Sequence, residues 1–75
     1  MEGIFLGFAN GVSHHTQKLA SVAWMIYAPT SQLVVSGGAN LGPATNSVAE
    51  YNAVIELLRD VILNGITYLE VCIDS

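Results

Sequence analysis

The sequence predicts an α+β domain in which three strands, one helix and a fourth strand follow one another (βββαβ). Residues 3–39 hold three short apolar segments separated by turn residues. Residues 47–64 form one long amphipathic segment, and residues 67–73 are again apolar. A hairpin followed by a helical crossover gives a mixed sheet of strand order 3-2-1-4, with one helix packed on it.

The first strand is predicted at residues 3–9, where both alternating sets of side chains are apolar. Such a strand is typical of the centre of a sheet that is covered on both faces. The dipeptide Asn10-Gly11 is expected to end this strand, because Asn and Gly favour turns. Residues 12–18 are polar and without periodicity, which predicts a loop.

The second and third strands are predicted at residues 19–28 and 32–39. Residues 29–31, Pro-Thr-Ser, favour a turn, since Pro fixes its own backbone angle and Ser and Thr hydrogen-bond to turns. A connection this short makes the two strands an antiparallel hairpin. The glycines at 37–38 are expected to weaken the end of the third strand or to introduce a bulge.

The helix is predicted from Ser47 to Asn64, and Gly65 is expected to supply the left-handed conformation that ends it. At about 100° per residue, one apolar stripe is expected to face the sheet, with Glu50 on its margin. The remaining charged side chains of the helix lie opposite, toward water. The stripe comprises Tyr51, Val54, Leu57, Leu58, Val61 and Gly65, and the opposite side includes Asn52, Glu56, Arg59, Asp60 and Leu63.

Strand directions bring three oxygen-bearing side chains to one end of the sheet. If the first and last strands are parallel neighbours, Asn10 and Asp74 lie at their carboxyl ends. The helix then begins at the same end, and Glu50 is about one turn into it. Ligand sites in open sheets favour the carboxyl ends of parallel strands. Carboxylate and amide oxygens are ligands for Mg²⁺ or Mn²⁺, so these residues are a candidate metal site.

Structural interpretations of the same residues remain open. Ser47-Val48-Ala49-Glu50 matches a capping box, in which the Glu side chain bonds back to the start of the helix. Asn10-Gly11 and Asp74 are equally compatible with ordinary turns.

Other chemistry-bearing side chains have simpler interpretations. The adjacent His14 and His15 are interpreted as solvated, because neighbouring positions rarely direct both rings at one ion. Ser13 lacks the context of a catalytic triad. Cys72, within a predicted strand, is expected to be a small core residue.

Composition restricts the class of protein. The chain has 75 residues, of which 52% are apolar and 11% charged, and such an apolar chain is expected to expose a patch that serves as an interface. Its net charge of -4 argues against binding a polyanion through this piece alone. A single cysteine and the absence of a signal peptide indicate an intracellular location, in the cytoplasm or nucleus. No apolar run is long enough to span a membrane.

Three segments together resemble the first half of a ribonuclease H domain of the plant and retroelement type associated with reverse transcriptases. They are F-A-N-G at residues 8–11, L-G-P-A-T-N-S-V-A-E-Y-N-A at residues 41–53, and I-D-S at residues 73–75. The resemblance covers the whole chain but only about half of the family's domain. Residues 1–75 are therefore interpreted as a truncated ribonuclease H-like domain.

The resemblance implies a five-stranded mixed sheet flanked by helices, and endonucleolytic hydrolysis of the RNA strand of an RNA–DNA hybrid. It also implies two Mg²⁺ ions held by four acids. Glu50 matches the family's helix acid and Asp74 the acid that ends the fourth strand, whereas Asn10 stands where the family has an Asp. The fourth acid would lie beyond Ser75.

With two of four acids missing, the chain is expected to have little or no hydrolase activity, and metal binding is expected to be weak. The sequence leaves open whether it is an enzyme or a non-catalytic nucleic-acid-binding or assembly module that keeps the fold. A homodimer through the fourth strand or an apolar face is also expected, because an exposed apolar strand edge invites pairing.

Overall fold

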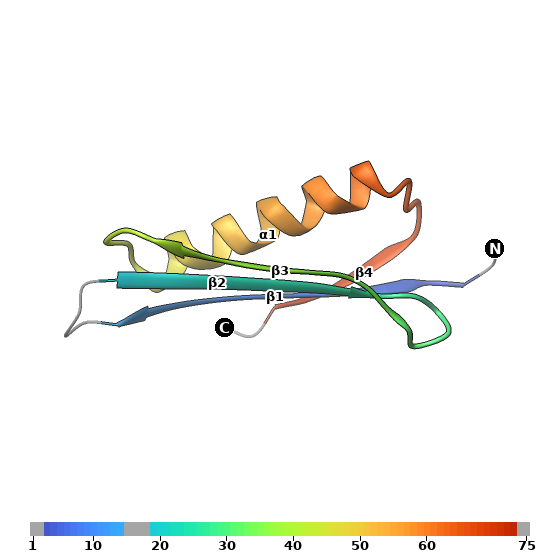
Figure 1. Cartoon of the computed structure of the whole chain (residues 1–75), viewed down its shortest axis with the longest axis horizontal. Coiled ribbons are helices and arrows are strands. Elements are labelled where there is room, and N and C mark those ends of the chain that lie inside the picture. Colours follow the sequence, from blue (N-terminus) through green and yellow to red (C-terminus); the bar gives the residue numbers. More distant parts are fainter. Residues whose placement is uncertain (1–2, 15–18, 74–75) are drawn as a thin grey trace.

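The computed structural model describes residues 3–14 and 19–73, which form one four-stranded sheet and one helix (Figure 1). The sheet has the order β3-β2-β1-β4, as predicted. β1 pairs antiparallel with β2 and parallel with β4, and β2 pairs antiparallel with β3. The elements are β1 (Phe5–His14), β2 (Leu19–Tyr27), β3 (Leu33–Leu41), α1 (Asn46–Leu63) and β4 (Leu69–Ile73).

β1 is longer than predicted, because Asn10-Gly11 does not end it. The antiparallel ladder with β2 runs from Leu6 to His14, and Gly11 pairs with Val22 inside it. Gly11 is instead required for packing against α1, because a Cβ there would lie 2.3 Å from the carbonyl carbon of Ala49. Residues 12–14 of the predicted loop therefore belong to β1, and residues 15–18, with His15, lie outside the described part of the chain.

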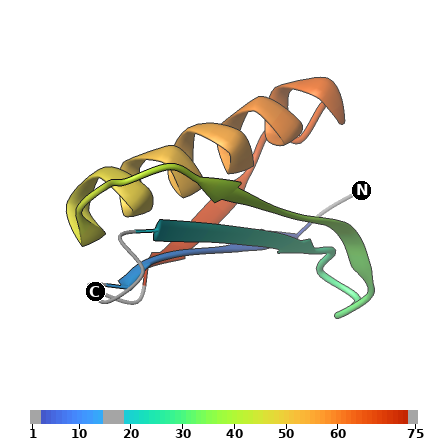
Figure 2. The ribbon, with the colours of Figure 1, turned by 60° about the vertical axis from the view of Figure 1, so that its left-hand side comes forward.

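α1 covers one face of the sheet, and no described element covers the other (Figure 2). Along β1, Gly7, Ala9 and Gly11 are buried, whereas Leu6 and Phe8 are exposed on the open face. The prediction that both faces of this strand are covered is wrong for the described structure. Cys72 is also exposed rather than a core residue. The buried core consists of Ala9, Ala20, Val22, Trp24, Ile26, Ala49, Ala53 and Leu57.

The predicted hairpin between β2 and β3 is confirmed. It turns through residues 28–32, where the Ser31 amide donates to the carbonyl oxygen of Ala28 at 2.8 Å and Ser31 has a φ of 72°. The register irregularity lies between Ile26 and Tyr27, not at the two glycines. Gly37 faces Trp24 across the strands, and a Cβ at Gly37 would lie 2.3 Å from the indole ring. The glycine makes room for the ring.

α1 begins at Asn46, one residue earlier than predicted, with Thr45 as its N-cap. The Thr45 hydroxyl accepts a hydrogen bond from the Val48 amide at 3.2 Å. The helix ends at Leu63, and Gly65 has the predicted left-handed conformation, with a φ of 66°.

The side of α1 that faces the sheet differs from the predicted stripe. Only Leu57 of that stripe is buried, and it is joined by Ala49 and Ala53 at intervals of four residues. Tyr51 and Leu58 are exposed. The small alanines let the helix backbone come close to the glycines of β1. The contact between α1 and the sheet therefore lies along these residues rather than along the centre of the predicted apolar stripe.

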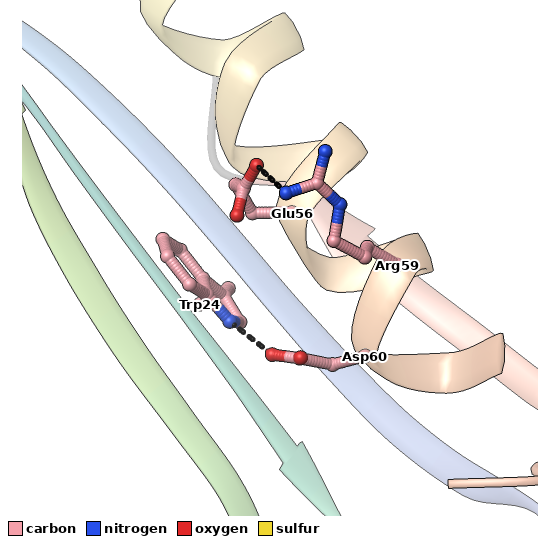
Figure 3. A network of polar contacts seen from close by, with 4 residues as sticks. All are labelled: Trp24, Glu56, Arg59 and Asp60. Atoms are coloured by element: carbon pink, nitrogen blue, oxygen red, sulfur yellow. Dashed lines mark hydrogen bonds and ion pairs between the residues drawn. The ribbon is translucent and has the colours of Figure 1, made fainter. Parts of the chain in front are cut away.

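Asp60 lies on the sheet side of α1 and not in water as predicted. Its carboxylate accepts a hydrogen bond of 2.7 Å from the indole Nε1–H of Trp24 (Figure 3). A buried indole N–H needs an acceptor, and this contact supplies one. The bond ties the carboxyl half of the helix to β2.

Candidate functional site

Asn10 lies on β1 where parallel pairing with β4 reaches its last described pair. That pair is Ala9 with Ile73. Asn10 itself pairs with Ala23 of β2 and is exposed. Its side chain belongs to the same alternating set as Phe8, which faces away from α1. Asn10 therefore presents its amide at the surface beside the carboxyl end of β4.

Glu50 lies on α1 at the same end of the sheet. α1 runs antiparallel to β1, since Leu57 meets Gly7 whereas the Ala49–Glu50 peptide meets Gly11. A Cβ at Gly11 would lie 2.5 Å from the Glu50 amide nitrogen. The helix backbone at Glu50 is thus in close contact with the residue that follows Asn10.

The capping box, one of the two interpretations of Ser47 and Glu50 left open by the sequence, is not formed in the structure. With Thr45 as N-cap, the position from which a Glu could bond back is occupied by Val48. Glu50 lies two residues further on, and its carboxylate makes no hydrogen bond or ion pair with another described residue. Glu50 is half-buried and does not take part in the cap of α1.

Ile73 lines the surface hollows beside both Asn10 and Glu50. One surface hollow is lined by Asn10, Ile73 and neighbours from β1, β2 and β4. A second hollow, of about 320 Å³, is lined by Glu50, Ile73 and further residues of α1. The structure therefore brings Asn10 and Glu50 to one end of the sheet, on either side of Ile73.

Two hydrogen bonds position the helix that carries Glu50. At its start, the Ser13 amide donates to the Asn46 side-chain oxygen at 2.7 Å, which joins the end of β1 to α1. Toward its end, Trp24 donates to Asp60 (Figure 3). Neither contact was predictable from the sequence, because each joins residues more than thirty positions apart. The only local signal is a tryptophan in a buried strand, which requires a polar partner.

The Glu56–Arg59 pair contributes little to this positioning. The Arg59 guanidinium nitrogen and the Glu56 carboxylate oxygen are 3.5 Å apart (Figure 3), and the Arg59 side chain is 66% exposed. Exposed pairs three or four residues apart on a helix typically stabilise by about 0.3–0.5 kcal/mol.

Two of the three residues predicted to hold a metal ion, Asn10 and Glu50, are among the described residues. Within residues 3–14 and 19–73, no group of three or more His, Cys, Asp or Glu side chains could hold a metal ion. Asp74, the predicted second carboxylate, lies outside the described residues, so its convergence with the other two remains a prediction. Glu50 and Asn10 offer one carboxylate and one amide oxygen, which suit Mg²⁺ or Mn²⁺ in kind. Together they carry a single negative charge.

Comparison with known families shows the family of the chain. A family model described as reverse transcriptase-like matches residues 8–75. The chain belongs to the reverse transcriptase-like family. This match includes Asn10 and Glu50, and it extends through Asp74. Among the described residues of this family member, no helix has the length and apolar character that crossing a membrane requires.

Relatives of this reverse transcriptase-like chain are ribonucleases H. Ribonuclease HI of Halobacterium salinarum is 32% identical over 68 residues, which are 91% of this chain and 34% of that protein. The crystal structure of RNase H1 from the same archaeon has a TM-score of 0.87 at 32% identity, covering 97% of this chain and 55% of that one.

Two further solved structures support the same fold. The N-terminal ribonuclease H domain of a Mycobacterium tuberculosis protein, solved as a fusion with maltose-binding protein, has a TM-score of 0.88 at 27% identity, covering 96% of this chain and 52% of that one. LC11-RNase H1, solved in complex with an RNA/DNA hybrid, has a TM-score of 0.86 at 25% identity, covering 95% and 54%. The resemblance to the first half of a ribonuclease H domain is confirmed, and the chain spans about half the length of these solved relatives.

Proposed function

We propose that this chain is a ribonuclease H-like nucleic-acid-processing domain whose site is centred on Glu50, with Asp74 and Asn10 as its other members. The observation that carries the proposal is the helix cap. Thr45 caps α1, so the Glu50 carboxylate is not used to cap the helix, and Glu50 lies at the end of the sheet where β1 and β4 run in parallel. The proposed substrate is an RNA–DNA hybrid, the ligand of one solved relative.

Mg²⁺ or Mn²⁺ is the proposed cofactor, and Glu50, Asp74 and Asn10 would hold it. Such an ion, when bound, supplies an activated water and stabilises the leaving oxygen of a phosphodiester. Asn10 would contribute a neutral oxygen in place of a carboxylate, which weakens the attraction for a doubly charged ion. Glu50 and Asp74 would carry the negative charge of the site.

As a separate 75-residue polypeptide, the chain is proposed to have little or no hydrolase activity, because the neutral Asn10 leaves the site one charge short. The test is incubation of the chain with a labelled RNA–DNA hybrid in Mg²⁺ or Mn²⁺, beside Glu50→Gln and Glu56→Gln variants. No cleavage above background is expected from any of the three. Cleavage that Glu50→Gln abolishes and Glu56→Gln preserves would show an active enzyme and contradict the proposed inactivity.

The second candidate is a non-catalytic nucleic-acid-binding or assembly module, favoured by Asn10, which no longer needs to hold a metal. Asn10→Asp discriminates between the two. It is expected to tighten Mn²⁺ binding, measured by calorimetry, because it restores a carboxylate beside β4. In a protein that also contains the second half of the fold, a gain of hybrid cleavage supports a damaged enzyme, and its absence supports the module.

Three further properties belong to the same proposal. The chain is proposed to act inside the cell, and its residues 1–75 are proposed to be part of a ribonuclease H-like domain of the plant and retroelement type. The homodimer remains a prediction for the isolated chain, since large apolar side chains such as Leu6 and Ile62 are exposed. Light scattering at high concentration tests it, and a mass of 8.0 kDa throughout argues against it.

A further inference from the structure

β3 forms one edge of the sheet along its whole length. β2 pairs with one side of β3, and no described strand pairs with its other side. In an antiparallel ladder, every second residue of an edge strand directs its N–H and C=O away from the neighbouring strand. β3 has 9 residues, so its outer side presents a row of backbone donors and acceptors.

The side chains of β3 leave this edge accessible. Gly37 and Gly38 lie at its centre and have no side chain, and the neighbouring Ser36 is small and exposed. Toward the hairpin, Leu33 and Val34 are 46% and 44% exposed. α1 packs chiefly on β1 and β2, so the helix does not shield the apolar side chains of β3. A further strand could therefore pair with β3 and cover them.

β3 lacks the features that usually prevent an edge strand from pairing. Such strands are commonly protected by charged side chains, by Pro or by a bulge. β3 contains no charged residue and no Pro. Its pairing with β2 is regular from Val35 to Leu41, because the irregularity lies beside the turn, where Ile26 and Tyr27 pair. The edge is thus suited to pairing over most of its length.

The distribution of charge indicates which partner fits this edge. The chain has a net charge of -4, so two copies repel each other where their charged regions meet. Residues 19–49, which include β2 and β3, carry no charge at all. The opposite edge, β4, has only 5 residues and exposes Glu70, so symmetric pairing there would bring two carboxylates together. A second copy therefore approaches more favourably along β3 than along β4.

We propose that β3 pairs antiparallel with β3 of a second copy, about a two-fold axis perpendicular to the sheet. Each copy then supplies donors and acceptors to the other in the same way, as a symmetric interface requires. The two sheets become one continuous sheet, with both α1 helices on the same face. This interface differs from the one through the fourth strand that the sequence suggested, and it does not depend on the proposed hydrolase site.

The first test is the mass of the pure chain as a function of concentration, measured by sedimentation equilibrium. The mass should rise from 8.0 kDa toward twice that value. Ser36→Lys should weaken the dimer by roughly tenfold or more, because it brings like charges close together across the two β3 strands. Cys72→Lys adds the same charge at an exposed position of β4 and is the matched control, with an expected change of less than about twofold.

Cross-linking with a short bismaleimide identifies the paired edge. In the Cys72→Ser background, Ser36→Cys provides a single thiol on β3, and it should give a cross-linked dimer. The wild-type chain carries its single thiol, Cys72, on β4. In the proposed dimer, the two β4 strands are separated by seven strand spacings, or about 34 Å, so Cys72 should not be cross-linked.

Three results would overturn the proposal: a monomeric mass at every concentration, equal effects of Ser36→Lys and Cys72→Lys, or cross-linking through Cys72 but not through Ser36→Cys. Circular dichroism confirms that each variant is folded, and the cross-linking decides the matter if Ser36→Lys does not fold. Since no readout involves cleavage or metal binding, failure here is distinct from failure of the proposed function.

Discussion

The two apolar sides of α1 show how differently small and large side chains are used. The line of Ala49, Ala53 and Leu57 is fully buried on the sheet. A second side of α1 carries the larger Tyr51 and Leu58, yet both remain exposed. The small residues of α1 pack on the sheet because β1 has glycines opposite them, and the two backbones can therefore approach closely. The hydrophobic pattern thus shows which residues of α1 could be buried. The size of their side chains decides which side of the helix packs on the sheet.

The largest effect is expected where the two backbones are closest. In Gly11→Ala, the new Cβ would lie 2.3 Å from the backbone of Ala49, and a helix backbone cannot yield as a side chain can. The cost should exceed about 4 kcal/mol, which is most of the stability of a small domain. Loss of the cooperative transition by circular dichroism is the expected result. A variant with wild-type stability would show that the close approach is not required.

The next effect concerns Leu57, the largest side chain of the buried line. Leu57→Ala should lower the free energy of unfolding by about 2–5 kcal/mol, since a fully buried leucine leaves a cavity. Urea denaturation measures the change. A loss below 1 kcal/mol would mean that the sheet side of α1 is loosely packed and would weaken the contrast between its two sides.

Asp60→Ala tests the polar contact on the sheet side. Removing the acceptor leaves the indole N–H of Trp24 unsatisfied in a partly buried position, at an expected cost of about 1–3 kcal/mol. Urea denaturation followed by the emission of Trp24, the single tryptophan, reports both stability and environment. Asp60→Asn keeps an acceptor oxygen and should be milder. Equal losses in the two variants would indicate that the charge, rather than the hydrogen bond, stabilises the contact.

The smallest effect is expected on the exposed side of α1. Tyr51→Ala in the isolated chain should change the free energy of unfolding by less than about 0.5 kcal/mol, because the ring is 72% exposed and Ala favours the helix. Urea denaturation measures the change, beside Leu57→Ala on the buried side. A loss above 1 kcal/mol from Tyr51→Ala would contradict the contrast between the two sides of α1.

Much of the fold follows from local pattern. The order of elements, the hairpin and the left-handed Gly65 are local properties, and the 3-2-1-4 sheet follows from the parallel crossover. The length of β1 was not predictable, because Asn10-Gly11 has the composition of a turn, whereas Gly11 is needed for contact with α1.

The candidate site was predicted in part. Strand directions place Asn10 and Glu50 at the same end of the sheet, and the structure agrees. The helix cap could not be decided from the sequence, because Ser47 and Glu50 match the capping pattern. The actual cap, Thr45, has Val48 at the position where that pattern requires an acid. The exposure of Cys72 was also not predicted, because an apolar strand does not show that one face of its sheet is uncovered.

The pairing of β4 with β1 has a consequence for the order of events in folding. β1, β2 and β3 are joined by short connections, whereas the pair Phe5–Leu69 closes a loop of nearly the whole chain. Such closure costs more chain entropy and slows folding, so β4 should dock after the three-stranded meander and detach before it. Amide hydrogen exchange should then be faster in β4 than at the centre of β1 and β2. The wall that Ile73 provides would therefore be the last part of the site to arise and the first to be lost.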